Sequence, residues 1–153
     1  MSGKHLGELV GLVGVIGSLV FVGLEVKQNT LAARAAAYQD MGSMISATWM
    51  LGAEDPELAA LTLRFFEEED AEFTPIEEAR LVSQTVGAFR QYETVWRQVQ
   101  LGLLDPEVLG YFGWGNPESI LSGNMKKLWP RIRQYMTPDF RAFLESESKW
   151  EGN

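Results

Sequence analysis

The chain has 153 residues, of which 46% are hydrophobic and 22% are charged, a balance typical of one globular domain and not of a disordered or collagen-like chain. Its formal net charge of -8 disfavours nucleic acid as a main partner, because binding to phosphates needs an excess of Lys and Arg. The absence of cysteine excludes disulfides, thiolate nucleophiles and cysteine-ligated metals, and leaves the compartment undecided.

The first element is an apolar segment near the N-terminus. No charge interrupts residues 9–24, and Glu8 and Glu25 flank them. A helix over 9–24 is about 24 Å long, which is short of the ~30 Å hydrocarbon core, whereas a helix over 6–26 spans it. We therefore predict an all-α protein with a single transmembrane helix at 6–26, followed by a small multi-helix domain at 27–153.

Two other interpretations of this segment stay open, a soluble core or interfacial helix and a cleaved signal peptide. Glycine costs a helix in water roughly 1 kcal/mol relative to alanine, so the segment's repeated glycines disfavour a soluble core helix. A signal peptide fits Lys4 and the later alanines, but Glu8 is acidic where a basic residue is expected, and Glu25 and Lys27 separate the apolar run from those alanines.

The segment carries its small residues on one face. Gly7, Gly11, Gly14 and Ser18 recur at i, i+4, i+7 and i+11, and Glu25 lies on the same side. In lipid, residues without a large side chain let helix backbones approach closely, and a carboxylate is least costly where it meets water or another protein. We predict that this glycine face binds other membrane protein helices, in a hetero-assembly or a homo-oligomer. The alternative is a lipid-facing glycine run with Glu25 at the interface.

Five of the six prolines repeat one pattern, in which a capping residue precedes proline and an acidic residue follows within two positions. This pattern predicts helix starts, because the first residue caps free amides, proline tolerates the first turn and the acid favours the positive end of the helix dipole. We expect helices at 31–51, 55–68, 74–101, 105–112, 117–136 and 138–148, with Pro130 kinking or dividing the fifth of these.

Four stretches resemble a group of small uncharacterised bacterial proteins: VFVGLEVKQNTLAARAAAYQ, AEDPELAALTLR, FRQYETVWRQVQLGLLDPEV and MTPDFRAFLES. The shared marks are the QNT sequence that ends the hydrophobic helix, the residues Tyr92, Glu93 and Trp96, and the turn at 102–105. The resemblance implies an N-terminal membrane helix followed by a helical domain, and it implies no activity.

The chain offers little for catalysis. Its only histidine, His5, precedes the apolar segment, so Ser-His-Asp, Cys-His and Glu-x-x-His di-metal sites are excluded. We expect no cofactor and no metal site. Catalysis by carboxylates alone stays possible, because two of them facing a cleft would suffice.

Glu93 lies on the apolar stripe of the predicted 74–101 helix, where a carboxylate needs a partner. Arg90 and Arg97 lie within reach, and Tyr92 is adjacent, so we predict a buried polar network of these four residues. A ligand or catalytic site around Glu93 is the alternative. Four further residues are interpreted first as core filling and second as an adaptable partner groove, namely Met41, Met44, Trp49 and Met50.

Two charged clusters remain. The acidic run Glu67, Glu68, Glu69, Asp70 and Glu72 lacks calcium-loop spacing, so it indicates a solvated helix end. The basic cluster Lys126, Lys127, Arg131 and Arg133 has three interpretations: a solvated face of ion pairs, a surface for anionic membrane lipid, or a nucleic-acid contact, which the net charge disfavours.

We therefore predict a single-pass accessory or interaction subunit of a larger membrane protein assembly, without catalytic activity of its own, in the bacterial inner membrane. The C-terminal flank of the predicted membrane helix has two basic residues, Lys27 and Arg34, and the N-terminal flank has one, Lys4. Because the flank richer in Lys and Arg tends to lie in the cytoplasm, this difference favours a cytoplasmic C-terminal domain. The alternative function is a membrane-tethered enzyme or small-ligand sensor with its site around Glu93.

Overall fold

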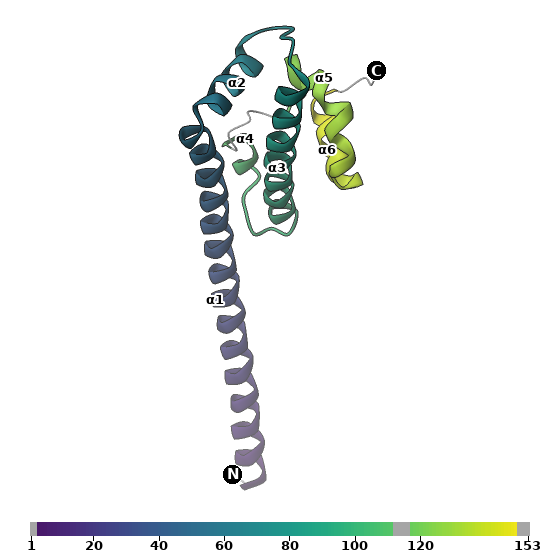
Figure 1. The fold of residues 1–153 in the computed structure, drawn as a ribbon. Helices are drawn as coiled ribbons and strands as arrows, with labels where there is room; N and C mark the ends of the chain where they lie inside the picture. The colour runs from purple at the N-terminus through teal and green to yellow at the C-terminus, as the bar shows by residue number, and fades with distance from the viewer. Residues whose placement is uncertain (1–2, 112–116, 150–153) are drawn as a thin grey trace.

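A computed structural model describes residues 3–111 and 117–149, and within these ranges every regular element is a helix. The all-α prediction is confirmed. Figure 1 shows one long helix, α1, with the shorter helices gathered around its C-terminal half. The elements are α1 (Gly3–Glu54), α2 (Pro56–Glu67), α3 (Pro75–Gln100), α4 (Val108–Tyr111), α5 (Gly123–Ile132), the 3₁₀ turn η1 (Arg133–Tyr135) and α6 (Pro138–Glu147).

Helix α1 runs without interruption from the apolar segment into the helical domain. The expectation of a separate helix beginning at residue 31 is wrong, because α1 is 52 residues long and passes through the Gln28-Asn29-Thr30 sequence. None of these three is Pro or Gly, and polar residues of this kind reduce helix propensity by less than about 0.7 kcal/mol each. The Thr30 hydroxyl is also satisfied within the helix, since it donates to the Val26 carbonyl at 2.9 Å.

The junction between α1 and α2 is set by Asp55 and Pro56. The residue before a proline avoids the α conformation, and Asp55 has an extended backbone with φ of -119°. Its Oδ1 accepts from the Leu58 N–H at 2.9 Å, and its Oδ2 accepts from Arg80 of α3 at 2.6 Å. Asp55 therefore ends α1, caps α2 and ties the junction to α3.

Helix α3 has well-formed ends. Thr74 and Glu77 form a reciprocal capping box at its start. At its end Gly102 has φ of +69°, the Leu103 N–H donates to the Gln98 carbonyl and the Gly102 N–H donates to the Val99 carbonyl. This is a Schellman motif, which requires a left-handed residue after the helix. The expected start and end of this helix agree with the structure within one residue.

Two other predicted boundaries need correction. The helix expected at 117–136 begins only at Gly123, because residues 117–121 form turns and Gly123 has a left-handed φ of +54° that no continuous α-helix can contain. Asn116, its expected cap, lies outside the described residues. The α-helix continues through Pro130 and changes to a 3₁₀ turn at Arg133. The helix expected at 105–112 is shorter, with α4 at Val108–Tyr111.

The core lies among α3, α5 and α6. Trp129, Ile132, Phe140 and Leu144 are fully buried there. The Tyr92 ring meets Phe140 edge-on at 5.7 Å, as aromatic pairs prefer. Helix α1 joins this core through four small or apolar side chains, namely Ala37, Met41, Met44 and Ile45. The domain therefore attaches to α1 from Ala37 onward.

Candidate interaction surfaces

The apolar segment of α1 projects away from the domain (Figure 1). Among the described residues, α1 is the one helix long and apolar enough to cross a membrane. Every residue from Gly7 to Ala36 is exposed, so the segment is not a helix of the domain's own core. The length and composition of α1 alone do not distinguish a membrane helix from a signal sequence.

The predicted glycine face is uncovered. Apart from its chain neighbours and the adjacent backbone of α1 itself, a Cβ atom built on Gly7, Gly11 or Gly14 meets no atom within 4 Å. The Ser18 hydroxyl donates to the Gly14 carbonyl at 2.9 Å, so it is already satisfied inside the helix. Glu25 is exposed on the same side. The face is thus open to close approach by another helix.

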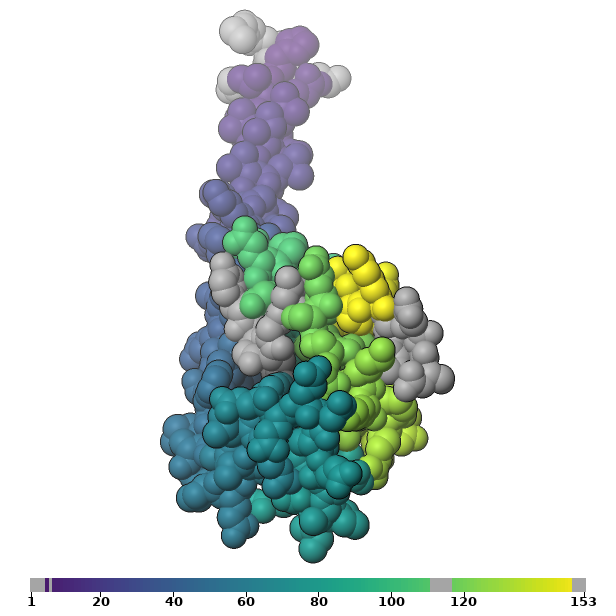
Figure 2. Space-filling model, turned by 90° about the horizontal axis from the view of Figure 1, so that it is seen from above, coloured from purple at the N-terminus to yellow at the C-terminus, as the bar shows by residue number. Residues whose placement is uncertain are grey.

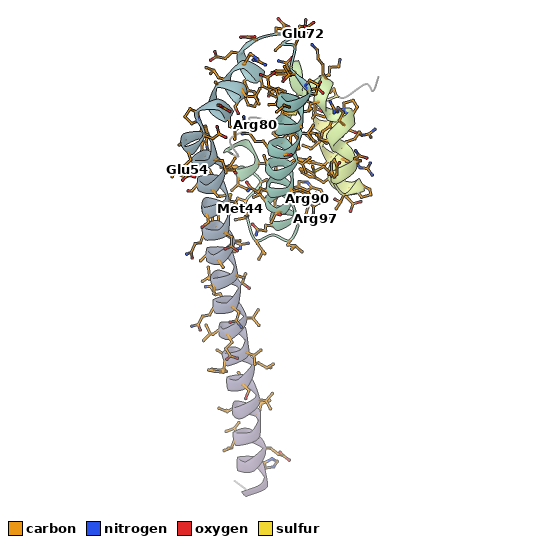
Figure 3. All side chains as sticks on the ribbon, in the orientation of Figure 1. Met44, Glu54, Glu72, Arg80, Arg90 and Arg97 are labelled. Atoms are coloured by element: carbon orange, nitrogen blue, oxygen red, sulfur yellow. The ribbon has the colours of Figure 1, made fainter. Side chains whose placement is uncertain are left out.

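Continuity of α1 fixes this face relative to the domain. At 3.6 residues per turn, the four residues of α1 that pack on the core lie on average roughly 135° around the axis from the glycine face, namely Ala37, Met41, Met44 and Ile45. Figure 3 labels Met44, which lies on the side of α1 turned toward α3. The glycine face therefore points away from the domain, and the domain leaves it accessible.

Glu93 is buried on α3 and has an arginine partner. Its side chain is 6% exposed, and its Oε2 accepts from Arg90 Nη1 at 2.7 Å. The expected burial and pairing are confirmed for Arg90. The arginine side chain is 53% exposed, so the pair joins a buried carboxylate to a guanidinium at the surface.

The other two members of the predicted network bond elsewhere. Arg97 donates to Asp139 Oδ2 and Thr137 Oγ1 of the α6 start, both at 3.3 Å, and its guanidinium lies over the Trp96 ring. Figure 3 shows Arg90 and Arg97 on the side of α3 turned toward α6. The Tyr92 hydroxyl donates to the Leu109 carbonyl, and burial raises the pKa of Tyr92. The predicted network is therefore reduced to the Arg90–Glu93 pair within α3, whereas Arg97 joins α3 to the start of α6 and Tyr92 joins it to α4.

The basic cluster is engaged in ion pairs across the domain. Lys127 pairs with Asp70, Arg131 with Glu78 and Arg133 with Glu145. The lysine contact lowers the pKa of Asp70, whose backbone is left-handed in the α2–α3 loop. This loop lies at the end of the domain farthest from the N-terminus (Figure 1). The ion-pair interpretation fits this arrangement better than a lipid surface beside the apolar segment.

No group of three or more acidic or histidine side chains is placed to hold a metal ion within the described ranges. The carboxylates of Glu67, Glu68 and Glu69 make no ion pair with any described residue. They form an exposed acidic end to α2.

An apolar groove lies where α1 meets α2. Its volume is about 640 Å³, and the exposed large apolar side chains that line it are those of Trp49, Leu63 and Phe66. Figure 2 shows α2 at the surface beside the last turns of α1. Trp49 and Met50 are 66% and 54% exposed, so the core-filling interpretation is wrong for these two residues, whereas Met41 and Met44 do pack on the core. Glu93 lines neither this groove nor a second hollow between α2 and α3.

Leu63 and Phe66 are interaction candidates that the sequence analysis missed. A signal for them exists, because Ala59, Leu63 and Phe66 recur at i, i+4 and i+7 beside the buried pair Leu61 and Phe65. Helix α2 thus has a second apolar stripe, whereas a surface helix that packs on the core through one face is polar on the other.

No family model, no curated protein and no solved structure matches this chain. The resemblance to the bacterial group described above therefore stays a prediction.

Proposed function

We propose that the chain is a single-pass membrane-anchored accessory subunit that binds the membrane helices of a larger assembly through its glycine face. The observation that carries this proposal is the exposed apolar segment, continuous with the helix on which the domain is built. A helix of this composition is costly to leave in water and favourable in lipid. The positive-inside rule and the resemblance support a bacterial inner membrane with the domain in the cytoplasm.

The orientation of the glycine face also supports the proposal. Because the domain packs on another side of α1, a partner helix can lie against Gly7, Gly11 and Gly14 without meeting the domain. A homo-oligomer through the same face is compatible with this geometry, with the domains on the outside. We find no observation that favours the alternative enzyme or sensor, since Glu93 is buried, paired and outside both hollows.

The proposal is tested by co-purification from bacterial membranes in mild detergent. Gly11→Ile with Gly14→Ile enlarges the glycine face and should abolish association, because backbones can no longer approach closely. Val13→Phe with Val20→Phe enlarges the opposite side equally and should be tolerated. Crosslinking scores self-association separately. Retention of every partner by the double isoleucine variant would show that this face is not the docking site.

A further inference from the structure

The groove between α1 and α2 is an exposed apolar surface far from the apolar segment. Its walls are Trp49, Leu63 and Phe66, which are 66%, 57% and 56% exposed. Its lining also includes three small residues, Gly52, Ala53 and Ala59. Small residues beside large apolar side chains let another backbone approach the two helices closely, as in helix-in-groove recognition.

The two threonine hydroxyls of the lining are hydrogen-bonded within the chain itself. The Thr48 hydroxyl donates to Gln91 at 2.6 Å, and the Thr62 hydroxyl donates to Gln84 at 3.2 Å. An occupant therefore meets mainly the apolar walls. Apart from Gln84 of α3, the lining residues fall in two helical segments, 45–53 and 59–67. Each segment is about 12 Å long, which matches the distance from i to i+7 on an occupying helix.

The charge around the groove selects a basic occupant. Glu67 lines the groove, and Glu68 and Glu69 follow it, none of them in an ion pair with a described residue. An exposed carboxylate cluster beside an apolar surface attracts Lys and Arg during encounter and disfavours acidic partners. A second copy of this chain is a poor fit, because its net charge is -8 and Lys127, Arg131 and Arg133 already pair internally.

A lipid surface is also a poor occupant. If residues 6–26 span the membrane, Trp49 lies 23 residues further along a continuous helix, which is about 35 Å from the hydrocarbon edge. That distance is well beyond the headgroup region, and anionic headgroups repel the acidic end of α2. The exposed tryptophan is therefore not part of an interfacial aromatic belt.

We propose that this groove binds an amphipathic basic helix of a partner protein, with apolar side chains at i, i+3 or i+4 and i+7 set against Trp49, Leu63 and Phe66 and with Lys or Arg near Glu67. The inference rests on the proposed role as an interaction subunit and gives that partner a second contact, outside the membrane.

The test uses the full chain in a neutral detergent and a fluorescent designed peptide. The peptide is a helix of about 18 residues with leucines at i, i+4 and i+7, lysines beside them and alanines elsewhere, and binding is followed by anisotropy. We expect saturable binding with a Kd below about 0.1 mM and a marked loss of affinity at high salt. A matched peptide with glutamate in place of lysine should not bind.

Matched variants locate the site. Trp49→Ala with Phe66→Ala should weaken binding by roughly tenfold or more, because buried aromatic anchors dominate such contacts. Met50→Ala with Leu101→Ala removes exposed apolar side chains outside the groove and should leave the affinity unchanged. Glu67→Gln with Glu68→Gln and Glu69→Gln should reduce the salt dependence. Circular dichroism verifies that each variant is folded.

Any of three peptide-binding results would overturn the proposal: no saturable binding to the wild type, equal binding by the groove variant, or equal binding of the acidic peptide. A wild-type dimer that Trp49→Ala with Phe66→Ala dissociates would instead assign the groove to a second copy and also overturn it. These results leave the glycine-face proposal untouched, because that proposal is tested by co-purification of membrane partners and not by peptide binding. The Gly11→Ile with Gly14→Ile variant should bind the peptide as the wild type does.

Discussion

At the scale of single residues, the buried carboxylate of Glu93 is the most consequential polar group of the domain. It belongs to α3, amid the aromatic core, and its ion pair with Arg90 is the contact that offsets its burial. Removing this carboxylate from water costs desolvation free energy that offsets the gain from the ion pair. Replacing both partners of such a pair by apolar groups is therefore often neutral for stability. Removing only Arg90 is a different change, because the charge left behind has no ion-pair partner.

We expect Arg90→Ala to lower the free energy of unfolding by about 1–3 kcal/mol, less than for a fully buried pair because Arg90 is half exposed. Arg97→Ala should cost about 1 kcal/mol or less, because both side chains of the Arg97–Asp139 pair are exposed. Arg90→Lys should recover part of the loss. Thermal unfolding in detergent measures all three, and a larger loss for Arg97→Ala than for Arg90→Ala would contradict this assignment.

The sequence could predict the burial of Glu93 but not its partner. Arg90 at i-3 and Arg97 at i+4 are equally near along one helix. Arg90 and not Arg97 pairs with Glu93 because the start of α6 places Thr137 and Asp139 against Arg97. That contact joins residues about forty positions apart, and no local pattern contains it.

At the scale of elements, proline caps made most helix starts predictable. Asp55, Thr74 and Thr137 precede the helices that begin at Pro56, Pro75 and Pro138. The same pattern was wrong at Pro117, because Gly123 has a left-handed backbone and restarts the helix further on. A glycine gives no sign in sequence of whether its φ is positive, since it adopts both hands readily.

The exposure of Trp49 and Met50 was not predictable either. A helix with apolar residues on several sides can be buried on any of them, and only the angle between α1 and α2 decides which. The bend at Asp55 leaves the Trp49 side of α1 facing an open groove instead of α3. Packing partners, rather than hydrophobicity, therefore separate the core methionines from the exposed pair.

The α1–α2 junction should respond to acid through Asp55. The hydrogen bond from the Leu58 N–H and the neighbouring Arg80 guanidinium lower the pKa of the Asp55 carboxyl group below its ordinary value of 3.8. A carboxyl group whose pKa is lower in the folded state contributes stability above its unfolded pKa, and this contribution is lost as the pH falls through the folded value. Asp55→Asn keeps the cap acceptor but removes the charge.

We expect Asp55→Asn to unfold at a lower temperature than the wild type near pH 7, with a difference that shrinks as the pH falls below the ordinary pKa of 3.8 and the wild-type carboxyl group is protonated. Asp40→Asn, at an exposed position of α1, is the matched control and should track the wild type throughout. Melting curves followed by circular dichroism provide the measurement. A constant difference across the whole pH range would show that the Asp55 charge does not stabilise the junction.

At the scale of the whole molecule, one continuous helix links two surfaces of different character. The apolar segment with its glycine face lies at one end of α1, and the groove with its acidic rim lies at the other. Because α1 is one uninterrupted helix without proline from Gly3 to Glu54, the rotation of one surface relative to the other is set by the helix itself. A partner could therefore be recognised at both ends in a defined orientation.

The central claim is that residues 6–26 hold the protein in a membrane, and alkaline carbonate extraction of membranes from cells that make the full chain tests it most directly. We predict that the chain stays in the membrane pellet at its full length. Ile16→Glu with Leu19→Glu should release it, because each charge at the helix centre costs about 2.5–3.5 kcal/mol on insertion. Recovery of the wild type in the supernatant, either at full length or shortened by a cleaved leader, would contradict the account.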